Sequence, residues 1–214
     1  MIRSLFWLSL KGIGPNVMVP ALPFLLVDGA LVYFSAFDLL TKDLILLVSD
    51  WILAPLSGWC VLFVFQPIVE EEGGQLFRSL PLNLKAYGIA NVLLLFGLQC
   101  VAVGLNTLFL RIAIGADAAW NWIAFRQALL SLFLMSLSFA AMMFTRDVSM
   151  SIVVVLAYIL CSSFLADYIP AFLNVFQNAR RFSGIADQTI ASLPVAVFGS
   201  WILLGIAQER LERG

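Results

Sequence analysis

Residues 84–110 read LKAYGIANVLLLFGLQCVAVGLNTLFL, and this stretch decides the fold. After Lys85 it holds no charged side chain, and the next one along the chain is Arg111. A helix needs about 20 mostly apolar residues to cross the hydrocarbon core of a bilayer, which is about 30 Å thick. The stretch is long and apolar enough for this, so it predicts a membrane-spanning helix.

Five further apolar runs of similar length occur along the chain. The six predicted spans are approximately 16–37, 44–69, 84–110, 123–144, 150–168 and 189–207. The connections between them are too short to form a separate soluble domain. We therefore expect a single, all-α, polytopic membrane domain over residues 1–214.

The composition agrees with a chain that is solvated by lipid. Of the 214 residues, 62% are hydrophobic and 12% are charged, whereas soluble domains average roughly 45–50% apolar and about 25% charged residues. The 12 basic and 13 acidic residues give no charge-based reason to expect a nucleic-acid partner. Histidine is absent, which excludes Ser/His and Cys/His nucleophile pairs and His-ligated metal within this chain.

Residues 1–15 differ from the spans, because polar side chains interrupt a short apolar stretch before Gly12, Gly14 and Pro15. This segment is too short to cross a bilayer. A signal peptide is the alternative, but no small-x-small cleavage site follows the apolar stretch. We expect an amphipathic helix that lies in the membrane interface.

The distribution of Lys and Arg predicts that both termini are cytoplasmic, since positive residues concentrate on the inner side of membrane proteins. With this orientation the inside carries seven of them: Arg3, Lys11, Arg78, Lys85, Arg146, Arg210 and Arg213. The outside carries five: Lys42, Arg111, Arg126, Arg180 and Arg181. Aromatic residues of the kind that lie at headgroup depth fall at the predicted outer ends of helices: Tyr33, Trp51, Trp120, Trp122 and Tyr168.

The connection 169–188 allows two interpretations. It contains Pro170, a short apolar set, and then Arg180 and Arg181. It is either a solvated loop or a short helix that dips into or lies on the outer leaflet. Irregular backbone at that depth would have to be covered by protein.

The connection after the second predicted span concentrates the scarce charge, and it reads EEEGGQLFRSLPLNLK over residues 70–85. Three glutamates open it, and one or two amphipathic turns follow, in which Leu76, Phe77 and Leu80 are apolar. Pro81 then ends the segment, because proline lacks the backbone donor and disfavours helix in the preceding residue. The pattern predicts a short helix across the end of a longer one, forming a surface for a cytoplasmic partner. An ordinary solvated loop is the alternative.

This order of residues resembles the first cytoplasmic loop of type-2 ABC exporter permeases. The acidic and glycine positions match Glu70, Glu71, Glu72 and Gly74, the apolar and proline positions match Leu76, Leu80 and Pro81, and the basic position matches Lys85. Asn83 stands where Ser or Thr is commoner, Lys85 is offset by one residue, and Asn91 stands near a position that is often lysine. The interfacial helix, six spans, cytoplasmic termini and outer-leaflet insertion are also similar to that family.

The resemblance implies that the short helix is a coupling helix, which docks on a separate cytoplasmic ATP-binding cassette ATPase. Leu76, Phe77 and Leu80 would be apolar anchors, Arg78 would form an ion pair at the rim, and Glu70 to Glu72 would make charged contacts. This chain has no GxxxxGK[ST] loop, so ATP and Mg would be bound by the partner and the chain itself is not expected to be an enzyme.

The resemblance further implies efflux across the cytoplasmic membrane of a bacterium by a complex that contains a second permease subunit, identical or homologous. The few charges in the spans favour a hydrophobic or amphipathic cargo, such as a peptide, a lipid-linked molecule or a drug. A proton-coupled secondary carrier and a non-transporting membrane scaffold are the alternatives.

Ionisable residues inside the spans are costly and therefore informative. Asp28 lies in the middle of the first span, after Pro20 and Pro23. It is either part of a substrate path or a proton-linked carboxylate, or else a neutral acid that is hydrogen-bonded to a neighbouring helix. We expect Asp50, near the outer end of its span, to be solvated, and Arg111 and Arg126 to extend to the interface.

Small residues that recur four positions apart allow helices to approach closely in lipid. Ser192, Ala196 and Ser200 form such a stripe in the last span, and Ala86 and Ala90 form one in the third. Both predict packing between helices of this chain.

Overall fold

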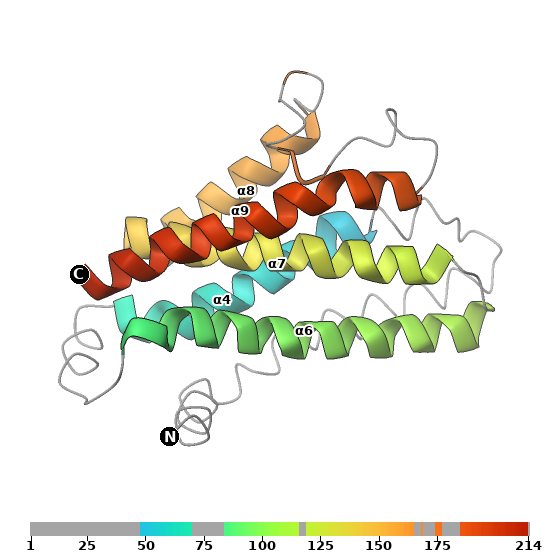
Figure 1. Cartoon of the computed structure of the whole chain (residues 1–214), viewed down its shortest axis with the longest axis horizontal. Coiled ribbons are helices and arrows are strands. Elements are labelled where there is room, and N and C mark those ends of the chain that lie inside the picture. Colours follow the sequence, from blue (N-terminus) through green and yellow to red (C-terminus); the bar gives the residue numbers. More distant parts are fainter. Residues whose placement is uncertain are drawn as a thin grey trace.

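A computed structural model of the chain describes residues 48–69, 84–115, 119–164, 168, 174–176 and 185–213. Every regular element within these residues is a helix (Figure 1). A π-helical turn, η2 (Ser49–Leu53), continues directly into α4 (Ala54–Val69). The helices α6 (Leu84–Ile114), α7 (Ala119–Thr145), α8 (Val148–Phe164) and α9 (Ile185–Arg213) follow.

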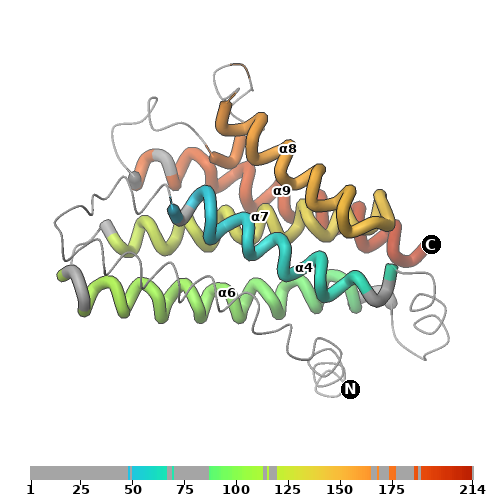
Figure 2. The backbone as a smooth tube through the Cα atoms, turned by 180° about the vertical axis from the view of Figure 1, so that it is seen from behind, coloured from blue at the N-terminus to red at the C-terminus, as the bar shows by residue number. Residues whose placement is uncertain are grey.

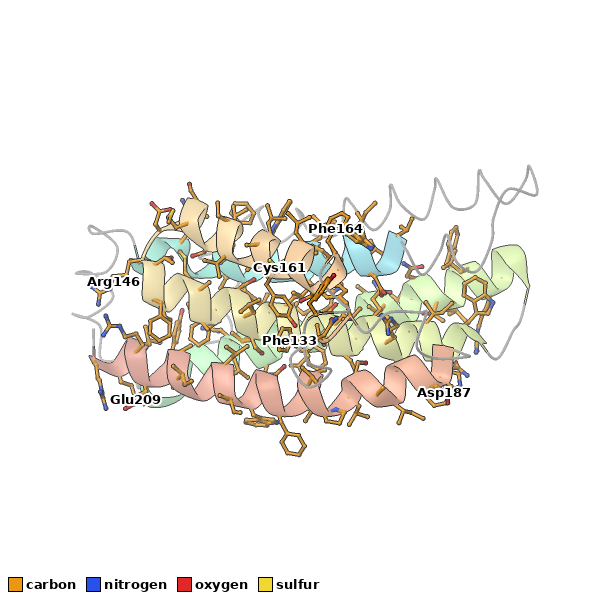
Figure 3. The ribbon with its side chains drawn as sticks, turned by 90° about the horizontal axis from the view of Figure 1, so that it is seen from above. Phe133, Arg146, Cys161, Phe164, Asp187 and Glu209 are labelled. Carbon is orange, nitrogen blue, oxygen red and sulfur yellow. The ribbon has the colours of Figure 1, made fainter. Side chains whose placement is uncertain are left out.

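The helices form an up-and-down bundle around α7. In Figures 1 and 2, α4, α7 and α9 run in one direction, and α6 and α8 run in the opposite one. Figure 3 shows Arg146 and Glu209 at one end of the bundle and Asp187 at the other. We call these the Glu209 end and the Asp187 end.

α7 is the central helix, since it contacts each of α4, α6, α8 and α9. In the most apolar stretch of α7, 72% of the residues are buried, whereas only 28% are buried in the most apolar stretches of α6 and α9. Nearer the Glu209 end lies an apolar cluster in which the rings of Phe65 and Phe139 are 4.6 Å apart. The exposed sides of α6 and α9 are apolar as well, so their composition suits contact with lipid.

Two short turns position the neighbours of α7. α6 ends at Gly115, whose φ of 114° is easy only for glycine and whose amide donates to the carbonyl of Arg111 at 3.1 Å. α7 ends in the same way at Arg146, which has a φ of 53° and whose backbone amide donates a hydrogen bond to the carbonyl of Met142 at 3.0 Å. Asp147 then caps α8, because its Oδ1 accepts the amide of Met150 at 2.8 Å.

Three helices in the described part of the chain are long and apolar enough to cross a membrane: Tyr87–Ile112, Trp120–Thr145 and Thr189–Arg213. By length and composition these are the helices of a membrane protein. They confirm the predicted spans 84–110, 123–144 and 189–207, although each helix extends further at one end or both. There are also two shorter apolar helices. Asp50–Gln66 lies within the predicted span 44–69, and Val148–Phe164 overlaps the predicted span 150–168.

The remaining architectural expectations stay predictions. Residues 1–15, expected to form an interfacial helix, and the first span at 16–37 lie outside the described residues. A total of six spans and the cytoplasmic position of both termini are therefore not tested. The same is true of a single domain over residues 1–214.

The predicted packing stripe in the last span is confirmed. Ser192, Ala196 and Ser200 are all buried, and Ala196 packs in one cluster with Leu130 and Leu134 of α7. The other stripe is wrong at Ala90, which is exposed. The close approach on α6 is made by Gly88 instead, where a Cβ would lie 2.5 Å from the ring of Phe139 and 2.6 Å from Gln208.

One of the predicted interfacial aromatics also lies elsewhere than expected. Trp51, Trp122 and Tyr168 are exposed, as headgroup contact requires. Trp120 is buried, and its indole N–H donates to the carbonyl of Gly115 at 3.0 Å. Its role is to close the turn between α6 and α7.

Candidate functional site

A buried ion pair lies in the half of the bundle nearer the Asp187 end. The Nε of Arg126, on α7, donates to both oxygens of Asp50 in η2, at 3.3 and 3.1 Å, and its Nη2 lies 2.9 Å from Asp50 Oδ2. The two side chains are 3% and 15% exposed. This paired, fork-shaped geometry is the one in which arginine binds a carboxylate most specifically.

The sequence-based expectations for both residues are therefore wrong. Arg126 does not extend to the interface, and Asp50 is not solvated. Arg126 is the eighth residue of α7, on the side of that helix that faces η2 and residues 174–176, so its guanidinium reaches η2 rather than water. Arg111 does lie at the Asp187 end, where it donates to Asn121 Oδ1 at 2.6 Å in an exposed bond.

The same guanidinium also holds a non-helical segment. Nη2 of Arg126 donates to the carbonyl of Phe176 at 2.7 Å. Residues 174–176 are buried and irregular. Two of their backbone amides have protein partners: Val175 donates to Tyr158 Oη at 3.3 Å, and Phe176 donates to Asn174 Oδ1 at 3.0 Å. The side-chain Nδ2 of Asn174 in turn donates to the carbonyl of Ser162 at 3.0 Å.

Aromatic rings enclose this segment. The ring of Tyr158 lies 5.2 Å from that of Phe133 and 6.4 Å from that of Phe176. Irregular backbone within a membrane is stable only when protein satisfies its polar groups. Residues 174–176 are irregular and buried in protein, as that expectation requires of backbone at membrane depth. Of the rest of 169–188 only the start of α9 is described, so the choice between loop and helix stays open.

The arrangement joins three elements that are distant in sequence, namely η2, α7 and residues 174–176, through one cation. The pair is formally neutral, so it can hold these elements together without leaving a charge in the apolar interior. In the part of the chain that the structure describes, no group of three or more Cys, Asp or Glu residues comes together as a metal site would require.

The predicted site residues fall almost wholly outside the described part. This applies to Asp28 and to most of the coupling segment that the resemblance implies: Glu70, Glu71, Glu72, Gly74, Leu76, Phe77, Arg78, Leu80 and Pro81. Lys85 is the second residue of α6, and its side chain is not described. The structure thus neither brings these residues together nor separates them.

The flanks of that segment are described. Val69 at the end of α4 and Tyr87 in the first turn of α6 pack on one apolar cluster, together with Val148 of α8 and Leu211 of α9. The connection 70–83 therefore begins and ends at the Glu209 end. Most of the exposed described charges lie at this same end: Arg146, Asp147, Glu209, Arg210, Glu212 and Arg213.

One hydrogen bond links the two helices next to this connection. Oε1 of Gln208, on α9, accepts the amide of Ile89, on α6, at 3.2 Å. Gln208 also donates through Nε2 to Glu212 at 3.2 Å. The first turns of α6 and the last turns of α9 are therefore held in register.

Comparison of the chain with protein-family models, with curated proteins and with solved structures finds no match in any of the three.

Proposed function

We propose that this chain is the membrane subunit of an ATP-driven exporter of the type-2 ABC permease class. The observation that carries the proposal is the connection between Val69 and Leu84. Its acidic, apolar and proline residues resemble the coupling segment of that family, and it leaves and re-enters the bundle at the end where the exposed charges gather.

In this proposal the connection binds a cytoplasmic ATPase, which supplies the sites for ATP and Mg. Movement of the connection would act first on the start of α6, a continuous helix of 31 residues. It would act on α9 as well, because Gln208 bonds to Ile89. Rigid helices that shift together are a common means of switching between two packed states.

The proposal includes the rest of the assembly. The chain would lie in the cytoplasmic membrane of a bacterium with both termini inside, and it would pair with a second permease subunit, identical or homologous. Cargo would pass between the two subunits. The apolar character of the helices favours a hydrophobic or amphipathic cargo, such as a peptide, a lipid-linked molecule or a drug.

Co-purification in a mild detergent tests the proposal. The wild-type chain is expected to retain an ATPase, and Leu80→Asp is expected to lose it, because a charge would replace an apolar anchor. Leu80→Met is the matched control and should retain the ATPase, since it preserves apolar volume. Recovery of the pure chain alone, with normal function, would contradict the proposal.

A second substitution separates the proposal from its rivals. If transport is abolished by Asp28→Asn and survives Leu80→Asp, a proton-coupled carrier that uses Asp28 is the better account. If neither substitution changes any transport but assembly of another protein fails, the chain is a scaffold.

A further inference from the structure

Four uncharged polar side chains are buried on α6 and α7. Gln99 and Asn106 on α6 are 5% and 7% exposed, and Gln127 and Ser131 on α7 are 4% and 0% exposed. We call these four residues the polar seam.

Helical spacing places the polar seam on facing sides of the two helices. On α6, Gln99, Val103 and Asn106 share one face, because they are separated by four and then three residues. On α7, Ala124, Gln127 and Ser131 share one face for the same reason. Val103 and Ala124 belong to one small cluster with Leu53 of η2, so the two faces are turned toward the same interior.

The antiparallel course of α6 and α7 brings the members to similar depths. Asn106 lies eight residues before the last residue of α6, and Gln127 lies eight residues after the first residue of α7. At 1.5 Å per residue, both are about 12 Å from their helix ends at the Asp187 end. Gln99 and Ser131 lie about one to two turns deeper. Further along, α7 presents Met135, Phe139 and Met142 to the apolar cluster.

Within the described part of the chain, each member of the polar seam has a buried polar atom without a hydrogen-bond partner. These atoms are Gln99 Nε2, Asn106 Oδ1, Gln127 Nε2 and Ser131 Oγ. Ser136, equally buried on the same helix, differs because its Oγ donates to the carbonyl of Leu132 at 2.8 Å. An unpaired polar group inside a protein is costly, so such groups mark places where something else completes the bonding.

We propose that the polar seam is a water-binding site, which holds a short file of ordered water reaching from the Asp187 end to the middle of the bundle. The seam offers both donors and an acceptor, and water pairs with both. It contains no charge, and the charges of Asp50 and Arg126 neutralise each other, although Arg126 Nη1 has no hydrogen-bond partner within the described residues, so an ion would be left without a counter-charge. A buried water needs two to four polar partners, and two helices with polar side chains at matching depths supply them. The site is independent of the proposed ATPase partner.

The inference places bound water toward the Asp187 end, where Arg111 and Asn121 form an exposed polar entry. Two further buried polar atoms, Trp59 Nε1 and Ser138 Oγ, also have no partner within the described residues, and they lie outside the polar seam.

Radiolytic hydroxyl-radical footprinting in lipid nanodiscs tests this inference, because radicals formed from bound water oxidise side chains that bulk solvent does not reach. The matched probes are Ser131→Cys and Ser136→Cys, each in a background in which the free Cys60, Cys100 and Cys161 are replaced by alanine. Oxidation is expected to be several-fold faster in the Ser131→Cys variant. Adding Asn106→Leu should reduce its rate to that of the Ser136→Cys variant.

The wild-type chain provides a second measurement that needs no substitution in the seam. Val103 lies between Gln99 and Asn106, whereas Val92, on the same helix, packs in the apolar cluster. Val103 should be modified several-fold faster than Val92, although both are buried. Equal rates for the two valines, or for the two cysteine variants, would overturn the inference.

Discussion

Arg126 of α7 pairs with Asp50 of η2 across 76 positions of the chain, and the same guanidinium donates to the carbonyl of Phe176, 50 positions later. One side chain thus joins η2, α7 and residues 174–176, which are far apart in sequence. Burying such a pair is costly in itself, so its presence does not show a net gain in stability. Its removal, one partner at a time, is more revealing.

We expect Arg126→Leu to lower the free energy of unfolding by about 3–5 kcal/mol, because Asp50 would be left buried without a counter-charge. Asp50→Leu should have a similar effect, because it would leave the guanidinium of Arg126 buried without a counter-charge. Denaturation of the purified chain by SDS in mixed micelles measures both.

The double variant Asp50→Leu with Arg126→Leu should be more stable than either single variant, since it leaves no unpaired charge. Arg111→Gln serves as a control, because its bond is exposed, and it should change stability by about 0.5 kcal/mol or less. Additive losses in the double variant would mean that the pair is not energetically coupled.

Removal of a hydrogen bond inside the segment 174–176 should loosen that segment. Asn174→Ala deletes both the bond to Ser162 and the acceptor of the Phe176 amide. We expect a loss of about 1–3 kcal/mol, which is the cost of leaving a buried partner unsatisfied. Limited proteolysis of reconstituted chain should show faster cleavage between α8 and α9.

Tyr158→Phe is a narrower version of the same experiment. It keeps the ring between Phe133 and Phe176 but removes the hydroxyl that accepts the amide of Val175. Cleavage should be faster than in wild type and slower than in Asn174→Ala. Cleavage at the wild-type rate would indicate that the ring alone holds the segment.

The contact between α4 and α7 at Gly58 should not tolerate a side chain. A Cβ at this position would lie 2.6 Å from Ser138 Oγ and 3.2 Å from the backbone oxygen of Leu134. We expect Gly58→Ala to destabilise the chain by about 1–3 kcal/mol through overpacking. Thermal unfolding in detergent, followed by circular dichroism, provides the measurement.

Gly104→Ala is the matched control, because it is also a glycine inside a helix but has open space around its Cα. Alanine there should stabilise the helix by about 0.5–1 kcal/mol. If the two substitutions had the same effect, the close approach of α4 to α7 would not limit packing.

The cap of α8 should contribute measurably to stability. Asp147→Ala removes the acceptor for the amide of Met150 and should cost about 0.5–2 kcal/mol, whereas Asp147→Asn keeps a capping oxygen and should cost less. Equal losses in the two variants would mean that the negative charge, rather than the hydrogen bond, stabilises this helix start. The same unfolding assay distinguishes them.

The long helices were predictable, because about 20 apolar residues without charge leave few alternatives. Their ends were not. α9 continues to Arg213, beyond the predicted end at Ala207, because Gln208, Glu209, Arg210 and Glu212 are good helix formers although they are polar. Apolar runs indicate where lipid is, and not where a helix stops.

The ion pair was missed because no local pattern links Asp50 to Arg126. A signal was present, however: the predicted topology puts both residues near the outer ends of their spans, where two opposite charges at equal depth would be able to pair. The polar seam was missed for a related reason. Amides and hydroxyls inside an apolar run barely lower its hydropathy, and whether they face lipid or a neighbouring helix depends on packing.

The order of the three partners along the chain bears on how the protein is made. Asp50 precedes Arg126 in the chain, and Phe176 follows both. In a chain made from its N-terminus, the carboxylate is therefore synthesised before the arginine that it neutralises, and the carbonyl that the same guanidinium holds is synthesised last.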